Sequence, residues 1–460
     1  MESIIYASVR TLAQAIRQKE VTAYEVVEAY LRRIEAVNPR LNAVVQLVAD
    51  TALAQARAAD DALARGERVG RLHGVPMTIK DSFDTAGVIS TAGTLGRAHF
   101  VPDNDAMVVA RLKAEGAILM GKTNTSELTL SFDPDNLVYG RTNNPYDLTR
   151  SPGGSSGGAA AIVASGGSPF DIGSDYGGSI RLPAHFCGVA GIKPTSGRVP
   201  RTGHIIPYAA GATDAYQQVG PLCRTVDDLA LIMSIIAGPD WQDPAIVPMP
   251  WQDPQTVDLK RLRIAFHTDN GAMTPTAETI QTVRAVARSL ESEVALLEEK
   301  CPPEIENTWA IWESVARVAG GQAYLNVIRQ AGTDQISPNV QYITDMPTIP
   351  SDEFEKRMVA LDHFRSRMLA FMQDYDVIIC PANANVALKV GEYAQNRAGY
   401  TYTATYNVTG WPGVVVRAGT SPEGLPIGVQ VIARPWREDV ALAVAQFVES
   451  TFGGWQPPEL

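Results

Sequence analysis

The sequence predicts an α/β fold: a single compact domain built on a large, mixed and mostly buried β-sheet covered by helices on both faces. Short apolar, β-rich runs alternate with helical patterns along most of the chain, which is typical of this class. No clear linker divides the 460 residues, of which 45% are hydrophobic and 19% charged. A chain of this length and composition can bury one large core. We therefore expect one domain over residues 1–460.

The first part of the chain predicts helices, followed by alternating strands and helices. Residues 9–67 have helical patterns, and Thr22 with Glu25 forms a capping-box pattern at the start of one helix. The apolar run "VPMTIKD" (75–81) predicts a strand. Further elements are expected in the order helix 105–116, strand 117–120, helix 157–167 and strand 169–175.

The rest of the chain continues this alternation around one long surface loop. Residues 239–255 are proline-rich and contain WQDP twice, but two copies of four residues do not indicate a repeat architecture. Strands are expected at 261–267, 375–381, 413–419 and 427–433. Helices are expected at 225–238, where Thr225 is the N-cap, and at 276–293, 304–330, 352–374 and from Asp439 onward.

Charge and cysteine content argue against several classes of protein. The net charge is −11, so nothing offsets repulsion from the phosphates of a nucleic acid. The four cysteines form no C-x-x-C pair, which is typical of reduced thiols in a cytosolic protein. No apolar run resembles a signal peptide or has the length of a membrane span. We expect a cytoplasmic monomer or homodimer with no nucleic-acid or membrane partner.

Two short motifs match known patterns but fail on their context. "GAILMGKT" (116–123) fits the phosphate-loop pattern, yet its variable positions are apolar and make sense only as a strand. "GSSGG" (154–158) fits G-x-S-x-G around Ser156, but a nucleophile elbow needs a preceding strand, and "TNNPYDLTRSPG" is turn chemistry. The sequence therefore indicates neither a P-loop nucleotide-binding protein nor a Ser–His–Asp hydrolase.

The histidines offer neither a metal site nor a base for these serines. His185, the first histidine after the serine loops, lies in an apolar run without an obvious acid partner. The others share no metal-ligand spacing, so we expect no bound metal and interpret them as structural: His73, His99, His204, His267 and His363.

One lysine and two glycine-flanked serine loops remain as candidates. Lys80 ends a predicted strand, where burial without full pairing would lower its pKa toward that of a useful base. The alternative is an ion pair with Asp81 or Asp84. In "DYGGSI" two glycines precede Ser179, so several backbone N–H groups can face one point, as an oxyanion hole for acyl transfer requires. The alternative for this loop is a helix capped by Ser179.

Taken together, these segments resemble the amidase signature family. The stretch "GGSSGGAAAIVASGGSPFDIGSDYGGSIRLPAHFCGVAGIKPT" (153–195) is similar to the family's defining motif along its whole length. "GKTNTSEL", "NNPYD", "VGPLCRTVDDLA" and "GWPGVVVRAG…GLPIGVQVIA" match further segments, so the resemblance covers roughly residues 70–435. It implies an amidase signature domain with a helical region at about 1–70 and a catalytic core at about 70–240 and 375–435.

The resemblance implies a Ser–cisSer–Lys triad in place of a histidine. Ser179 would be the nucleophile, Ser155 the bridging serine after a cis peptide bond, and Lys80 the base. Asp175 and Arg181 would form a structural ion pair that supports the loop. Hydrolysis through an acyl-enzyme then needs no cofactor. The oxyanion hole would consist of the backbone N–H groups of Tyr176, Gly177, Gly178 and Ser179.

The resemblance leaves the substrate open. A stand-alone amidase for an aryl or alkyl carboxamide is favoured, and a carbamate (urethane) or hydrazide hydrolase with the same triad is the alternative. The glutaminase subunit of a tRNA-dependent amidotransferase is less favoured, because the loop "DAYQQVGP" differs and no charged pair that grips glutamine can be assigned. Segment 301–350, with Tyr324 and Tyr342, is either a pocket wall or lid or an aromatic-packed helix pair. The expected pocket residues are Thr125, Ser131, Phe132, Trp309 and Trp312.

Overall fold

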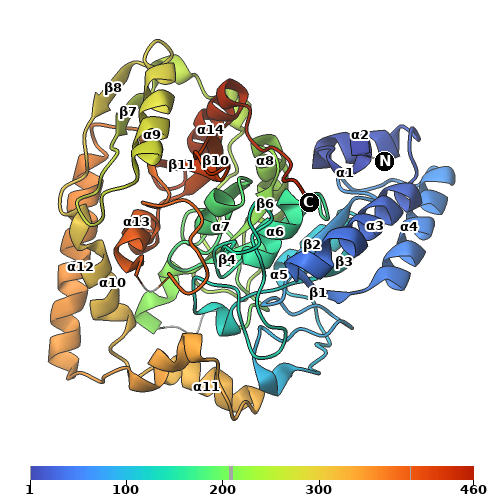
Figure 1. Cartoon of the computed structure of the whole chain (residues 1–460), viewed down its shortest axis with the longest axis horizontal. Coiled ribbons are helices and arrows are strands. Elements are labelled where there is room, and N and C mark those ends of the chain that lie inside the picture. The colour runs from blue at the N-terminus through green and yellow to red at the C-terminus, as the bar shows by residue number, and fades with distance from the viewer. Residues whose placement is uncertain (1, 207–210, 394) are drawn as a thin grey trace.

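A computed structural model describes residues 2–206, 211–393 and 395–460 (Figure 1). Within these ranges one mixed sheet of eleven strands runs in the order β1-β3-β2-β4-β6-β5-β10-β11-β9-β7-β8. The strands are β1 (Val44–Leu47), β2 (Pro76–Lys80), β3 (Ile118–Thr123), β4 (Phe170–Asp175), β5 (Ala190–Lys193), β6 (Gln218–Cys223), β7 (Arg263–Phe266), β8 (Leu296–Glu299), β9 (Val377–Pro381), β10 (Gly413–Thr420) and β11 (Pro426–Ala433).

The sheet has parallel strands toward its two ends and antiparallel strands in its middle. Strands β3, β2 and β4 are parallel, as are β9, β7 and β8, while β4, β6, β5, β10, β11 and β9 are joined by antiparallel pairs. Every residue of β2, β3, β4, β5, β6, β9 and β11 is buried, as expected for strands that are covered on both faces. The prediction of a mixed and mostly buried sheet is confirmed.

Helices cover both faces of this sheet. Helices α6 and α7 pack on each other and on β4, β10 and β11, while α8 and α14 pack on each other and on β6 and β10. The helices of the described ranges are α1 (Glu2–Ile5), α2 (Val9–Arg17), α3 (Ala23–Leu41), α4 (Ala49–Ala64), α5 (Met107–Ala114), α6 (Gly157–Ala164), α7 (Arg181–Phe186), α8 (Val226–Ile236), α9 (Ala277–Leu290), α10 (Thr308–Ala316), α11 (Gln322–Ala331), α12 (Ser351–Phe371), α13 (Thr401–Val408) and α14 (Glu438–Phe452).

The N-terminal region is helical as expected, with one strand that the sequence did not reveal. The capping box of Thr22 and Glu25 is present at the start of α3. The expected helical stretch 9–67 is interrupted by β1, which pairs antiparallel with β3. Helix α3 ends where Asn42 adopts a left-handed conformation with φ of 51°. A strand of four residues is too short to show a period of two in the sequence.

The expected helix 304–330 is two helices. Gly320 and Gly321, with φ of 59° and 63°, separate α10 from α11. A helix needs negative φ throughout, so two consecutive left-handed residues end it. Figure 1 shows α10 and α12 at the left of the molecule and α11 at the bottom, all away from the N-terminal helices α2, α3 and α4 at the right.

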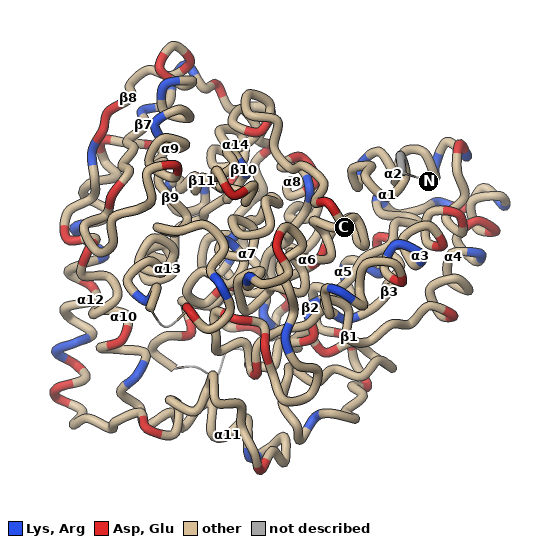
Figure 2. The backbone as a smooth tube through the Cα atoms, viewed as in Figure 1, with Lys and Arg blue, Asp and Glu red and all other residues tan. Residues whose placement is uncertain are grey.

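The outer surface carries charges of both signs. Figure 2 shows acidic and basic residues alternating along α12, where Asp352–Lys356 and Glu353–Arg357 are paired one turn apart. Among the described residues, no helix combines the length and the apolar character that a bilayer span requires.

Two neighbouring parallel strands bring the candidate residues together. Strand β2 pairs with β4 in a register that places Thr78 beside Asp171 and Ile79 beside Ile172. Lys80 is the last residue of β2, and Asp175 is the last residue of β4. Because both strands point the same way, their carboxyl ends meet at one edge of the sheet, where α/β folds place their sites.

Candidate active site

Lys80 lies among three serine hydroxyls. Its side chain is fully buried, and its Nζ is 2.7 Å from the Oγ of Ser155. The hydroxyls of Ser156 and Ser174 each lie 2.9 Å from the same nitrogen. The peptide bond between Gly154 and Ser155 is cis, as the family resemblance implied.

The acidic residues next to Lys80 in the sequence have other partners. The Asp81 carboxylate accepts hydrogen bonds from the N–H and the hydroxyl of Thr91, at 3.1 and 2.5 Å. Asp84 is paired with Arg97. Within the described part of the chain, neither carboxylate forms an ion pair with Lys80. The alternative that Lys80 is merely paired with Asp81 or Asp84 is therefore wrong.

Burial makes Lys80 a weak base by the standard of lysines. Loss of hydration of the ammonium group is the largest cause, and the negative charges of Asp175 and Asp171 oppose it, which leaves the pKa at about 7 instead of 10.5. A lysine with such a pKa is partly neutral near pH 7, so its nitrogen has a free electron pair that can accept a proton.

Ser179 follows β4 in a tight glycine loop. Gly178 has φ of 138°, and a Cβ atom there would lie 2.3 Å from Oγ1 of Thr403, so only glycine fits. The Ser179 side chain is 5% exposed and lines a cavity. Helix α7 begins only at Arg181, after Ile180, so the alternative that Ser179 caps a helix is wrong.

The four backbone N–H groups expected in the oxyanion hole are not equivalent. The N–H of Gly178 donates to Oδ1 of Asp175 at 2.9 Å, so it is already engaged. The N–H groups of Tyr176, Gly177 and Ser179 have no acceptor among the described residues. All three residues line the same cavity. Of the four expected N–H groups, the geometry thus leaves those of Tyr176, Gly177 and Ser179 available to a ligand oxygen.

The two serine loops contact each other through their backbones. The N–H of Ser156 donates to the carbonyl of Ser179 at 3.2 Å. Among the described residues, the hydroxyls of Ser155 and Ser179 are not hydrogen-bonded to each other. Catalytic hydrogen bonds of a free enzyme are often long and shorten when the substrate binds.

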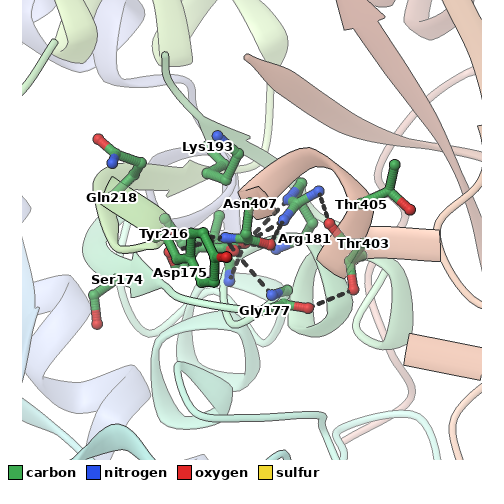
Figure 3. Close-up of polar contacts among 12 residues, drawn as sticks. Ser174, Asp175, Gly177, Arg181, Lys193, Tyr216, Gln218, Thr403, Thr405 and Asn407 are labelled. Atoms are coloured by element: carbon green, nitrogen blue, oxygen red, sulfur yellow. Dashed lines mark hydrogen bonds and ion pairs between the residues drawn. The ribbon is translucent and has the colours of Figure 1, made fainter. Parts of the chain in front are cut away.

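A buried ion pair supports the Ser179 loop (Figure 3). Arg181 Nη2 and Asp175 Oδ1 are 2.9 Å apart, and both side chains are fully buried. Burial raises the pKa of Asp175, but the Arg181 charge and hydrogen bonds from Arg181 and Asn407 outweigh it and lower that pKa to about 2. Thr403 also donates to the carbonyl of Gly177 at 2.7 Å. The expected structural ion pair is present, and it fixes the loop from behind.

A cavity of about 220 Å³ opens beside Ser179. Its walls are mainly aromatic: the rings of Trp309 and Trp312 stack 5.2 Å apart, and those of Phe132 and Tyr400 stack 3.8 Å apart. Of the five expected pocket residues, Ser131, Phe132, Trp309 and Trp312 line the cavity, whereas Thr125 is fully buried and does not. Thr125 directly follows Asn124 and the end of β3, so it lies buried at the edge of the sheet and not at the cavity.

Segment 301–350 provides one wall of this cavity. Besides the two tryptophans it contributes Tyr324 and Tyr342. The hydroxyl of Tyr324 lies 3.2 Å from that of Tyr176 in the Ser179 loop. The segment therefore forms a wall of the cavity. Within the described ranges α10 packs mainly on α12 and α13 and not on α11, so the alternative of a packed pair of helices is wrong for α10 and α11.

Several residues of the site could not be found by reasoning from the sequence. Arg317 and Arg397 line the cavity, and both are paired with Glu313. Ser156 and Ser174 contact Lys80. In the sequence, Ser156 stood out only as the centre of a rejected motif, and the only signal for Ser174 was its position near the end of a predicted strand. The phosphate-loop match is confirmed to be a strand, β3. Among the described residues, no group of three or more His, Cys, Asp and Glu side chains is placed to hold a metal.

Comparisons with known proteins agree with this geometry. The Amidase family matches residues 25–442. Fatty-acid amide hydrolase 2 of Homo sapiens is 32% identical over 99% of this chain and 91% of that protein. A glutamyl-tRNA(Gln) amidotransferase subunit of Moorella thermoacetica is 34% identical over 99% of both proteins. The solved structure of a bacterial aryl acylamidase superposes with a TM-score of 0.87 at 26% identity, covering 97% of this chain and 96% of that one.

The fold, the site and these matches together define the class of the protein. The chain belongs to the amidase signature family. It is an enzyme that hydrolyses C–N amide bonds.

Proposed function

We propose that the protein is a stand-alone amidase that cleaves an apolar aryl or alkyl carboxamide through an acyl-enzyme on Ser179. The observation that carries this proposal is the position of Ser179, which lines an aromatic cavity while its loop contacts the serine loop that holds Ser155 against Lys80. The reaction needs no metal or other cofactor, because a neutral lysine supplies the base.

In the first half of the reaction Ser179 is acylated. Its oxygen bonds to the amide carbon while its proton passes to Ser155, whose own proton passes to the Nζ of Lys80. The carbonyl electron pair moves onto oxygen, and the N–H groups of Tyr176, Gly177 and Ser179 stabilise that charge. The C–N bond then breaks, and the amine leaves with a proton from Ser155, which regains one from Lys80.

In the second half water releases the acid. A water molecule attacks the ester carbon and gives a proton to Ser155, which again passes one to Lys80. When the tetrahedral intermediate collapses, the bond to Ser179 breaks and its oxygen recovers a proton along the same route. The enzyme returns to its starting state, so one amide and one water yield one acid and one amine.

The cavity wall supports an apolar substrate. The rings of Phe132, Trp309 and Trp312 offer flat surfaces for an aryl group or a short alkyl chain. Two relatives have corresponding names, a fatty-acid amide hydrolase and an aryl acylamidase. Carbamates and hydrazides remain the second candidate class, because the same acyl transfer cleaves them and the cavity does not distinguish them.

A substrate panel tests this proposal. Purified enzyme is assayed without ATP on an anilide, an aliphatic amide, glutamine, a carbamate and a hydrazide, with Ser179→Ala as the control for contaminating activity. We expect the highest kcat/KM on the anilide or an apolar amide. Activity on glutamine alone, and only when other proteins are added, would instead assign the role named for the amidotransferase relative.

A further inference from the structure

His204 lies behind the lysine, in a loop that pairs with the end of β2. The N–H of Asp84 donates to the carbonyl of Gly203 at 2.8 Å, and the N–H of Ile205 donates to the carbonyl of Ser82 at 2.8 Å. The His204 ring is 3% exposed and packs edge-on against Phe83 at 4.9 Å. The loop therefore holds the ring at a fixed place relative to Lys80.

The hydrogen bonds around His204 define which nitrogen carries the proton. The N–H of Ile206 and the amide of Gln217 both point at Nδ1, at 3.1 and 2.8 Å. The Ile206 carbonyl lies 3.0 Å from Nδ1, but a nitrogen that accepts from these two donors has no proton to give to it, and Gln217 donates to this carbonyl at 3.0 Å. Nδ1 is thus the acceptor, and the proton assigned from this network is on Nε2. Nε2 lies 3.0 Å from the Oγ of Ser174 and donates to it.

The three serines around Lys80 have different hydrogen-bond capacities. The hydroxyl of Ser156 donates to the carbonyl of Ser174 at 3.2 Å, so its oxygen accepts from Lys80. The Ser174 oxygen accepts from His204 and from Lys80. A neutral amine has two N–H groups and one electron pair. With both N–H groups bound to Ser156 and Ser174, the electron pair faces Ser155.

We propose that His204 is a positioning residue for the base: its Nε2–H orients Ser174 so that the Lys80 amine directs its free electron pair at Ser155. This inference rests on the role of Lys80 in the proposed function. Without the histidine, the Ser174 oxygen loses one donor and accepts more strongly from the ammonium form of Lys80. This change favours a protonated Lys80, so the base should titrate at a higher pH.

The effect of His204 on the titration of Lys80 must be distinguished from the effects of the charged groups nearby. Asp171 and Asp175 face Lys80, and burial raises the pKa of Asp171 to about 7. Burial and then the Lys80 charge lower the pKa of His204 to about 3, with smaller contributions from Arg201 and Arg97. His204 is therefore neutral at neutral pH, and its own titration does not contribute to the pH dependence of labelling. Asp171 titrates in the same range as Lys80, so it needs a control.

The test uses the pH dependence of covalent labelling, which needs no knowledge of the substrate. The second-order rate constant for labelling of Ser179 by phenylmethylsulfonyl fluoride is measured from pH 5.5 to about 9.5, and the midpoint of its rise reports the base. We expect His204→Phe to raise this midpoint by about one pH unit, the size of one hydrogen bond. In His204→Gln the side chain can still donate to Ser174, so the midpoint should stay close to the wild-type value.

Matched variants isolate the histidine. His185 is also fully buried, and its Nδ1 likewise accepts a backbone N–H, from Gly428 at 2.7 Å, but it does not contact the lysine. His185→Gln should leave the midpoint unmoved. The His204→Phe shift should persist when Asp171→Asn is also present. It should vanish in a Ser174→Ala background, where the connection is already cut. If His204→Phe folds poorly, His204→Leu, which also lacks a donor to Ser174, replaces it in both backgrounds.

The outcomes distinguish the two proposals. A His204→Phe enzyme that labels more slowly at every pH, with an unchanged midpoint, overturns the positioning role and leaves the proposed function standing. The positioning role is also overturned if His204→Phe shifts the midpoint by the same amount in the Ser174→Ala background as in the wild type. If the wild-type protein is not labelled on Ser179 at all, the proposed function fails and this inference fails with it.

Discussion

The serine–lysine centre and segment 301–350 meet at one cavity but are built differently. Lys80, at the end of β2, and Ser155, in the loop before α6, are fully buried, and each hydroxyl near the lysine contacts its nitrogen. Segment 301–350 contributes two helices whose rings face the cavity, and the indole N–H groups of Trp309 and Trp312 have no partner among the described residues. We infer that the polar contacts determine the reaction type, whereas the aromatic wall selects the substrate.

The largest effect is expected when the base itself is changed. Lys80→Arg keeps the positive charge, but guanidinium stays protonated and cannot accept the proton of Ser155. We expect kcat/KM on the best amide of the panel to fall by at least about 10²–10⁴-fold. Lys122→Arg, on the neighbouring strand β3 and also fully buried, controls for the size of the new side chain. An Lys80→Arg enzyme with more than a tenth of the original activity would show that the lysine is only a structural cation.

The candidate residues of the centre could be proposed from the sequence because most of them lie close together in motifs. Ser155, Ser179 and the glycines between them lie in a stretch of about forty residues, and Lys80 ends a strand whose apolar pattern is plain. The structure brings these residues together at the ends of β2 and β4.

The same reasoning failed where contacts depend on tertiary packing. Nothing near His204 in the sequence indicates that it reaches Ser174, and the hydrogen bond between Asp175 and Gly178 follows from loop geometry alone. Strand β6 was missed because Gly220 and Pro221 lie inside it, and both residues are uncommon in strand interiors. The break in helix 304–330 depends on two glycines that a helical pattern tolerates.

The second prediction concerns the support of the Ser179 loop. Asp175→Ala leaves the buried guanidinium of Arg181 without its counter-charge, which should lower the free energy of unfolding by about 3–5 kcal/mol. Urea denaturation at pH 7 measures this. Asp352→Ala removes an exposed ion pair with Lys356 on α12 and should cost at most about 1 kcal/mol. Equal costs for the two variants would mean that the buried pair does not hold the loop.

A third prediction follows from the lowered pKa of Lys80. The unfolded chain keeps this proton up to about pH 10.5, whereas the folded protein releases it near pH 7. The unfolded state therefore binds more protons between these values, so the contribution of Lys80 to stability rises with pH. Relative to Lys80→Met, the wild type should gain about 1.4 kcal/mol of unfolding free energy per pH unit between about pH 7.5 and 9.5. A constant difference over this range would mean an unshifted lysine.

The smallest effect is expected at the cavity wall. Trp309→Leu removes a flat surface without touching the reacting groups, so kcat/KM for an anilide should fall about tenfold. The value for a small aliphatic amide should change by less than about twofold, because such a substrate does not reach the ring. Trp241→Leu, at a tryptophan that is 90% exposed, is the control and should change neither value. Equal losses on both substrates would place Trp309 in support of the centre instead.

The central claim is that Ser179 forms the acyl-enzyme, and peptide mapping after covalent labelling tests it most directly. The enzyme is treated with an organophosphorus or sulfonyl fluoride reagent, and the modified residue is located by mass spectrometry. The account predicts one label per chain, on Ser179, and at least about 10²-fold slower labelling of the same residue in Ser155→Ala. A label on Ser155 or Ser156 would contradict the assignment of the nucleophile.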